Sequence, residues 1–265
     1  MINKLKAKLK KRFPKLLLMG FRLFNNPKDI SALLQFVRNK NLPISFQQRC
    51  YLIKKMYQIS YHVDCPHTQH EIISFINAIL LAPKEAKGCV VEAGCFKGGS
   101  TAKFSIAAKM VNRKLMVFDS FEGIPENDEL HNKNIFGGDA AFPKGSFCGA
   151  LNEVKSNVEK FGDINSCVFI KGWFDNTLPA FSTPVLTAYI DVDLASSTKT
   201  CLKYFYPLLI ENGTMFSQDG HLPLVIEVLK DDKFWLHEVG FSKPEMLGIG
   251  RDKLIFIQKK NQIFS

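Results

Sequence analysis

The sequence lacks several features that would assign it quickly to a class of proteins. No apolar run among its 265 residues approaches the roughly 20 residues that span a bilayer, and its N-terminus has no small-residue cleavage site of a secretory signal. Its seven cysteines are an odd number, and none are paired as Cys-x-x-Cys, which argues against a disulfide framework and a structural zinc site. We therefore expect a cytoplasmic protein with one main domain.

The glycine-rich turn in VVEAGCFKGGST, residues 90–101, lacks the residues of two common nucleotide motifs. Gly94 and Gly99 have the spacing of a phosphate-binding loop, but Ser100 stands where that loop needs its lysine. The glycines at 94, 98 and 99 also fail to make G-x-G-x-x-G, the dinucleotide fingerprint. The turn is therefore expected to hold a third kind of ligand.

The net charge of +10 is concentrated near the N-terminus. Residues 1–27 form a basic arm in which seven lysines and arginines precede an apolar stretch. This arm is either a solvated terminal helix or a peripheral contact with anionic lipid or an acidic partner, and we expect it to be dispensable for catalysis. The basic residues are not interleaved with stacking aromatics, so nucleic acid is not an expected partner.

Two further segments follow the arm. Residues 28–84 form a helical cap with helices over 29–40, 45–63 and 68–82, and with Asp29, Ser45 and Thr68 as N-caps. Residues 85–262 alternate short β-rich runs with helical periods, which predicts a mainly parallel sheet covered on both faces. Strands are expected at 89–94, 114–120, 167–172, 185–193, 213–219 and 253–259, and helices near 99–111, 149–161, 197–210 and 222–232.

Acidic residues lie at the ends of four of these strands: Glu92, Asp119, the pair Asp191 and Asp193, and Asp219. Ligands of open α/β sheets bind at the carboxyl ends of the strands, so each acid is a candidate. Asp119 lies at the tip of the strand after the glycine turn, where a carboxylate can accept both hydroxyls of a ribose.

Glu92 separates the possible nucleoside ligands, because a carboxylate beside the turn repels a pyrophosphate and attracts an ammonium or sulfonium group. S-adenosylmethionine carries both of those cations and a ribose. Gly94 and Gly98 would let the backbone approach this ligand, and the helix starting near Gly99 would offer N–H groups to its carboxylate. The alternative is that the glycines merely permit a tight strand-to-helix turn.

Longer motifs support this interpretation. VVEAGCFKGGST, VFDSFEGIPE, GSFCGALNEVKSNV, IKGWFDNTLPA, YIDVDLASSTKTCLKYFYPLLIENGT and QDG occur in the order and rough spacing of the macrocin O-methyltransferase family, which the sequence resembles over about residues 63–258. The resemblance implies a Rossmann-like class I methyltransferase fold, with a seven-stranded, mostly parallel sheet and a helical N-terminal cap. It also implies magnesium-dependent methylation of a hydroxyl on a sugar or glycosylated small molecule, with S-adenosylmethionine as donor. A homo-oligomer is compatible with this function, and the alternative is a non-catalytic nucleotide-binding or S-adenosylmethionine-binding protein.

The resemblance also assigns residues to parts of the cofactor. Glu92, Gly94 and Ser100, beside Gly98, would contact the methionine end. Asp119 and Ser120 would hold the ribose. Gly172 and Trp173 would lie near the adenine, although Trp173 is otherwise an ordinary core aromatic.

A magnesium site is implied at two strand ends. Asp191 and Asp219 can coordinate one cation if their strands are neighbours, because adjacent strands lie about 4.8 Å apart. The ion would take the acceptor hydroxyl into its shell and lower the pKa of that hydroxyl. The family usually has two adjacent aspartates where this chain has Gln218 and Asp219, so we expect a weakened or vestigial site.

The acceptor hydroxyl also needs a base. Asp191 is the first candidate, and His221 and His131 are spare general bases. Asp193 is expected either to cap a helix or to contact the metal ligands without binding the metal itself. His131 belongs to the long polar segment 125–147, which is expected to be a mobile lid or a disordered surface.

Overall fold

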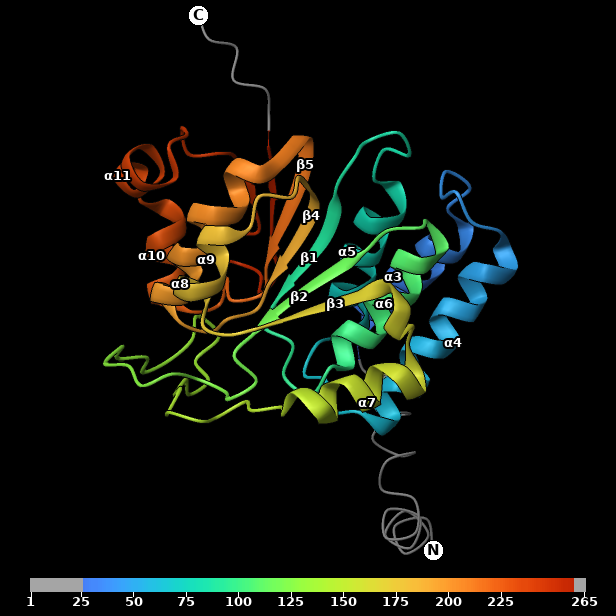
Figure 1. Cartoon of the computed structure of the whole chain (residues 1–265), viewed down its shortest axis with the longest axis horizontal. Helices are drawn as coiled ribbons and strands as arrows, with labels where there is room; N and C mark the ends of the chain where they lie inside the picture. Colours follow the sequence, from blue (N-terminus) through green and yellow to red (C-terminus); the bar gives the residue numbers. More distant parts are fainter. Residues whose placement is uncertain (1–25, 260–265) are drawn as a thin grey trace, which may run out of the picture.

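A computed structural model describes residues 26–259 of the chain (Figure 1). The basic arm predicted for residues 1–27 therefore lies almost wholly outside the described residues, and its role stays a prediction. Among the helices that are described, none is both long and apolar enough to cross a membrane.

The core of the molecule is a seven-stranded sheet with the order β3-β2-β1-β4-β5-β7-β6. Its strands are β1 (Cys89–Ala93), β2 (Leu115–Asp119), β3 (Cys167–Lys171), β4 (Val185–Ile190), β5 (Leu209–Ser217), β6 (Met246–Leu247) and β7 (Ile255–Gln258). Neighbours from β3 to β5 pair in parallel, and β7 is antiparallel to both β5 and β6. The predicted seven-stranded, mostly parallel sheet is confirmed, although the two-residue β6 was not among the expected strands.

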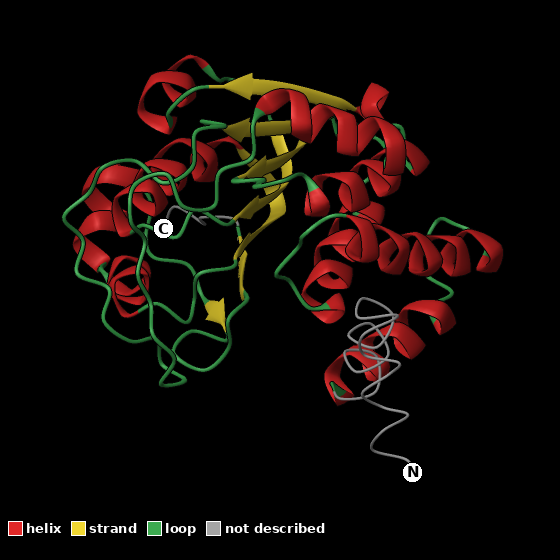
Figure 2. Ribbon diagram, turned by 90° about the horizontal axis from the view of Figure 1, so that it is seen from below, coloured by secondary structure: helices red, strands yellow, loops and turns green. Residues whose placement is uncertain are grey.

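Helices cover both faces of the sheet, as Figure 2 shows. The helices of one face are α3 (Pro27–Arg38), α4 (Phe46–His62), α5 (Gln69–Leu81), α6 (Gly99–Met110) and α7 (Leu151–Phe161). The other face carries α8 (Phe174–Thr177), α9 (Ala195–Leu208), α10 (Pro223–Lys230), α11 (Asp232–Phe234) and a π-helix over Trp235–Val239. Alternate residues of one strand enter different cores: Val90 packs with the first group and Val91 with the second.

The helical segment 28–84 packs into the same hydrophobic core as α6 and the sheet. Ser45 caps α4 as predicted, in a capping box with Gln48, and Thr68 precedes α5, where its N–H donates to the Glu71 carboxylate at 2.8 Å. The predicted N-cap Asp29 is wrong. Asn26 caps α3 one turn earlier, because Pro27 fits the first helical position.

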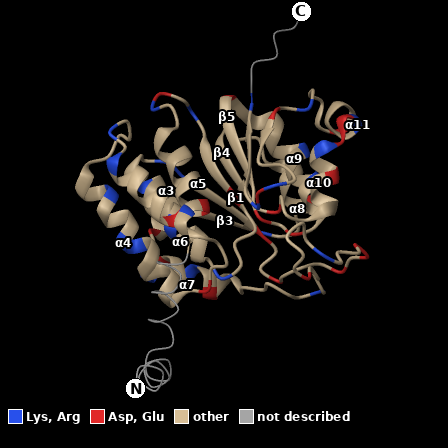
Figure 3. Cartoon of the chain, turned by 180° about the vertical axis from the view of Figure 1, so that it is seen from behind, with Lys and Arg blue, Asp and Glu red and all other residues tan. Residues whose placement is uncertain are grey.

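The segment 125–147 closes over the carboxyl ends of the strands. Its two ends are tied together by the hydrogen bonds from Ile124 N–H to Ser146 O (2.9 Å) and from Gly145 N–H to Ile124 O (2.8 Å). Its middle is tied by the bond from Ile135 N–H to His221 O (2.9 Å). The ribbon colours of Figure 3 mark residues of both charges in the loops at this edge, whereas the charged residues of α4 are mainly basic.

Candidate active site

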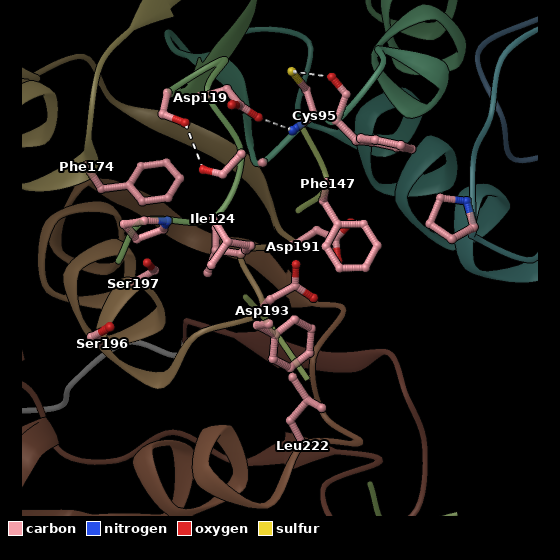
Figure 4. A pocket seen from close by; sticks show the side chains of 18 of the residues that line it. Cys95, Asp119, Ile124, Phe147, Phe174, Asp191, Asp193, Ser196, Ser197 and Leu222 are labelled. Atoms are coloured by element: carbon pink, nitrogen blue, oxygen red, sulfur yellow. Dashed lines mark hydrogen bonds between the residues drawn. The ribbon is translucent and has the colours of Figure 1, made fainter. Parts of the chain in front are cut away.

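A cavity of about 510 Å³ lies at the carboxyl ends of the strands, under segment 125–147 (Figure 4). Asp119 at the end of β2 and Asp191 after β4 both line it, on either side of β1. The structure thus brings the predicted ribose residue and the predicted base into one space. Eight of the predicted site residues line the cavity: Gly94, Ser100, Asp119, Ser120, Gly172, Trp173, Asp191 and His221. Four others lie outside its lining: Glu92, Gly98, Gln218 and Asp219.

The glycines of the turn pack closely against other residues of the protein. Gly94 has φ +82°, and a Cβ there would lie 1.9 Å from the carbonyl oxygen of Asp191. A Cβ on Gly98, which has φ +79°, would lie 3.0 Å from Val154 Cγ1. A Cβ on Gly99 would lie 2.8 Å from Cys65 Cβ. The idea that Gly98 lets a ligand approach is therefore not supported, and tight packing of the turn explains all three positions.

Asp119 is held in place by backbone donors. Its Oδ2 accepts a hydrogen bond from Cys95 N–H at 2.7 Å, and its Oδ1 accepts one from Phe121 N–H at 2.7 Å. Burial raises the pKa of Asp119, and these N–H groups oppose that rise. The carboxylate is thus fixed at the cavity wall. Trp173 is 36% exposed, so the reading of it as a core aromatic is wrong.

Glu92 lies beneath the turn, away from the cavity. It is completely buried, and neither of its carboxylate oxygens has a hydrogen-bond partner among residues 26–259. Burial raises the pKa of Glu92 to about 8, although the nearby hydroxyls of Ser100 and Thr101 oppose the rise. The side chain is therefore mostly uncharged at neutral pH, and its predicted attraction for a sulfonium group has no geometric support.

His67 is the main site residue that the sequence did not indicate. It lies just before α5 and lines the cavity, and its Nε2 donates to Asp191 Oδ2 at 2.8 Å. Burial lowers the pKa of His67, but Asp191 and Cys65 outweigh burial and raise it to about 10. In turn, His67 keeps the pKa of Asp191 below its ordinary value despite burial. Asp191 is therefore an ionised carboxylate, and 22% of its side chain remains exposed.

No local signal reveals this pair, because 124 residues separate its members in sequence. A histidine preceding a helix N-terminus is ordinary in a sequence. Only the packing of α5 against the sheet brings His67 to the end of β4.

The predicted magnesium ligands do not form a metal site. Gln218 Oε1 accepts the hydroxyl of Tyr189 at 2.8 Å in the core, and Asp219 Oδ2 accepts the N–H groups of Val192 (3.0 Å) and Asp193 (2.9 Å). Asp219 Oδ1 is buried without a partner among the described residues, but Asp219 lies outside the cavity lining. Within residues 26–259, no three His, Cys, Asp or Glu side chains are arranged to hold a metal ion. The donor set therefore does not fit magnesium.

Protonation, instead of a metal ion, can reduce the repulsion between the carboxylates of Asp191, Asp193 and Asp219. Burial, and then Asp219 and Asp191, raise the pKa of Asp193 to about 9. Burial and Asp191 raise that of Asp219 to about 7. Lys253, which also lines the cavity, lowers both values. The cluster thus carries fewer than three negative charges at neutral pH.

Asp193 does not cap a helix, because the segment 125–147 supplies that cap. Leu194 is the N-cap of α9, and the Glu129 carboxylate accepts the N–H groups of Ala195 (2.7 Å) and Ser196 (2.8 Å). Glu129 Oε2 also lies 3.0 Å from His131 Nε2. His131 therefore supports the cap of α9 and lies outside the cavity lining.

His221 faces the cavity from the turn before α10. Burial, and then Lys253, lower the pKa of His221 to about 4, so its imidazole is neutral at neutral pH. Its Nδ1 is buried and has no hydrogen-bond partner in the described part of the chain. The ring stacks with Phe136 of segment 125–147 at 6.4 Å between centroids. His221 is therefore a neutral, weakly basic residue at the cavity wall.

Comparisons with known proteins identify the family and the fold of the chain. A model of the macrocin O-methyltransferase family (TylF) matches residues 74–231, more than half of the chain. No curated protein matches significantly. Among solved structures, the O-methyltransferase NovP is similar, with 19% identity over 81% of this chain and 100% of NovP and a TM-score of 0.62. The calicheamicin methyltransferase CalS11 is also similar, with 17% identity over 89% of this chain and 94% of CalS11 and a TM-score of 0.57.

The two structural likenesses show the fold, which is that of the class I methyltransferases. The family match adds the chemistry, which is transfer of a methyl group from S-adenosylmethionine to oxygen. The chain is an O-methyltransferase and belongs to the macrocin O-methyltransferase family.

Proposed function

We propose that the protein methylates a hydroxyl group of a sugar or of a glycosylated small molecule, with S-adenosylmethionine as methyl donor. The observation that carries the proposal is that Asp119 and Asp191 open into one cavity from the two strands that flank β1. Two strand spacings are roughly 10 Å, which leaves room for the ribose at one acid and the reacting centre near the other.

The cofactor brings a methyl group that its sulfonium already activates, so the task of the protein is to orient and deprotonate the acceptor. Asp119, fixed by two backbone N–H groups, would accept the ribose hydroxyls. Gly94 and Ser100 would lie at the methionine end, Ser120 beside the ribose, and Gly172 with the exposed Trp173 at the adenine. These assignments are supported by the position of each residue at the cavity wall.

Asp191 would take the acceptor proton. His67 holds one of its oxygens, which leaves the other free to face the cavity and sets the direction from which a hydroxyl is accepted. As the new O–CH3 bond forms, the S–CH3 bond breaks and the hydroxyl proton passes to Asp191 and then to solvent. His67 would keep the carboxylate in place during this transfer.

The cavity walls support a sugar as acceptor. Ser196, Ser197 and Thr200, at the start of α9, line the cavity together with the aromatic residues Phe142 and Phe147. Hydroxyls and flat apolar rings together suit a ring that carries hydroxyl groups on an apolar skeleton. CalS11 is described as a TDP-rhamnose 3'-O-methyltransferase, which supports the same class of acceptor.

Transfer from labelled S-adenosylmethionine to a panel of glycosides and nucleotide-linked sugars tests the proposal. Asp191→Asn preserves the shape of the side chain, and we expect it to lower turnover by about 10²-fold to 10⁴-fold while calorimetry shows unchanged binding of S-adenosylhomocysteine. Loss of turnover in His221→Ala with normal turnover in Asp191→Asn would move the base to His221. Binding of NAD in preference to S-adenosylhomocysteine would defeat the cofactor assignment.

The magnesium requirement is tested in the same assay. Because the donor set does not fit magnesium, we expect EDTA to leave turnover within about twofold of the untreated rate. A loss of activity that added magnesium restores would show that the acids rearrange around a metal ion when substrate binds.

A further inference from the structure

A buried hydrogen bond between a lysine and a cysteine lies beside the cavity, and the function proposed above does not use it. Lys103, on α6, is fully buried, and its Nζ donates to Cys65 Sγ at 3.3 Å. This is the one hydrogen bond that the Lys103 side chain makes within the described residues. A buried ammonium group is stabilised by an opposite charge. Lys103 therefore favours the thiolate form of Cys65 over the thiol.

A second cation approaches the same sulfur. His67 Nδ1 lies 3.5 Å from Cys65 Sγ, while the other nitrogen of this ring holds Asp191. Burial raises the pKa of the Cys65 thiol, but Lys103 and His67 outweigh burial and lower it to about 6. Burial raises the pKa of two other buried cysteines: to about 12 for Cys89, and well above its ordinary value for Cys95.

Cys65 is also within reach of small reagents. It is buried in the protein but lines the cavity, next to Gly99 at the N-terminus of α6. Ser100, which we place at the methionine end of the cofactor, lines the same cavity. A small molecule that enters the cavity when no cofactor is bound therefore reaches the wall that Cys65 lines.

We propose that Cys65 is a modification site: a thiolate, held between Lys103 and His67 at the wall of the cofactor cavity, that reacts with peroxides and other small electrophiles. With hydrogen peroxide, the sulfur attacks one oxygen, an S–O bond forms and the O–O bond breaks. The sulfur is oxidised to a sulfenic acid, and the peroxide is reduced to hydroxide, which buffer protonates. A thiol reductant restores the cysteine.

Oxidation would act on the active site through His67. It removes the negative charge between Lys103 and His67, and it adds an oxygen atom where Cys65 packs against Gly99. The cofactor wall and the orientation of Asp191 would both change. This consequence for activity rests on the proposed function, whereas the reactivity of Cys65 does not.

The size of the effect can be worked out at pH 6. There about half of Cys65 is thiolate, against about 0.3% of an ordinary thiol, which is a ratio of roughly 150. The lower nucleophilicity of a less basic thiolate offsets about tenfold of this ratio. The net expectation is roughly tenfold faster reaction than an ordinary thiol.

The test treats the intact protein with peroxide at pH 6, traps sulfenic acid with dimedone and maps the modified peptides by mass spectrometry. Cys50 and Cys148, which are exposed, serve as internal comparisons. We expect labelling of Cys65 about tenfold above both, at least fivefold protection by S-adenosylhomocysteine, and loss of labelling in Lys103→Met but not in Lys103→Arg. The half-maximal labelling rate of the wild-type protein should fall near pH 6, which needs no variant that could misfold.

Labelling of Cys50 and Cys148 but not Cys65 would overturn the proposal. Equal labelling in Lys103→Met would overturn the role of the lysine, and labelling unaffected by S-adenosylhomocysteine would overturn the placement at the cofactor wall. Because labelling needs no acceptor, the result is independent of whether the acceptor is a sugar.

Discussion

Replacing Cys65 with serine should change how the stability of the protein depends on pH. Folding raises the pKa of His67 from 6.5 to about 10, since Asp191 and Cys65 outweigh burial, and it lowers the pKa of Cys65 from 9.0 to about 6. The stability from His67 is full below pH 6.5 and is lost as pH rises through 10. The stability from Cys65 is full above pH 9 and is lost as pH falls through 6.

These two contributions cancel over a wide range in the wild-type protein. Between about pH 6.5 and about pH 9, the folded protein carries the proton on His67 while the unfolded chain carries it on Cys65. Both states then bind the same number of protons at this pair. The pair therefore contributes almost no slope to the free energy of unfolding against pH.

Each single substitution should remove this cancellation. The remaining residue then gives the free energy of unfolding a slope against pH. In Cys65→Ser, the folded protein holds one proton more than the unfolded chain, so the free energy of unfolding falls by about 1.4 kcal/mol per pH unit. Relative to wild type, the loss between pH 6.5 and pH 8.5 is up to about 3 kcal/mol. His67→Gln should give a rise of similar size, and the double variant should run parallel to wild type. Both values are upper limits, because removing one partner also reduces the pKa shift of the other.

Urea unfolding at several pH values in this range measures these slopes. The buried Trp235 provides a fluorescence signal, and subtracting the wild-type curve removes the titration of all other groups. If both single variants run parallel to wild type, the thiolate and imidazolium do not exist as a pair, and the reasoning fails.

Three further predictions concern the cofactor, the core and the turn. Asp119→Ala should weaken binding of S-adenosylhomocysteine at least tenfold, or by about 1.4 kcal/mol, in calorimetry, and unchanged affinity would remove Asp119 from the ribose site. Gln218→Leu should lower the free energy of unfolding by about 1–3 kcal/mol because the Tyr189 hydroxyl loses its acceptor, and Tyr189→Phe in the same chain should recover part of the loss. Gly94→Ala should destabilise by more than about 4 kcal/mol, since its Cβ would lie 1.9 Å from a carbonyl oxygen, whereas Gly137→Ala, at the same φ with nothing within 4 Å, should cost only about 1–2 kcal/mol in thermal unfolding.

The sequence alone determined the class of fold and the edge of the sheet where the site lies. Alternation of β-branched runs with helical periods located six of the seven strands, because a strand buried on both faces must be continuously apolar. Asp119 and Asp191 were predictable because residues at the carboxyl end of a parallel strand lie at the ligand edge wherever that strand lies in the sheet. The N-caps of α4 and α5 were also predictable, because capping depends only on residues within one helical turn of each other.

Tertiary packing decided which polar side chains reach the cavity and which enter the core. Glu92 and Gln218 lie at the ends of strands, yet both are fully buried away from the cavity, because neighbouring residues of a strand point to opposite faces. Lys103, Cys65, His67 and Asp191 come from α6, from the segment before α5 and from the end of β4. Their contacts exist only because α5 and α6 pack side by side on one face of the sheet, a contact between distant segments that no local sequence pattern encodes.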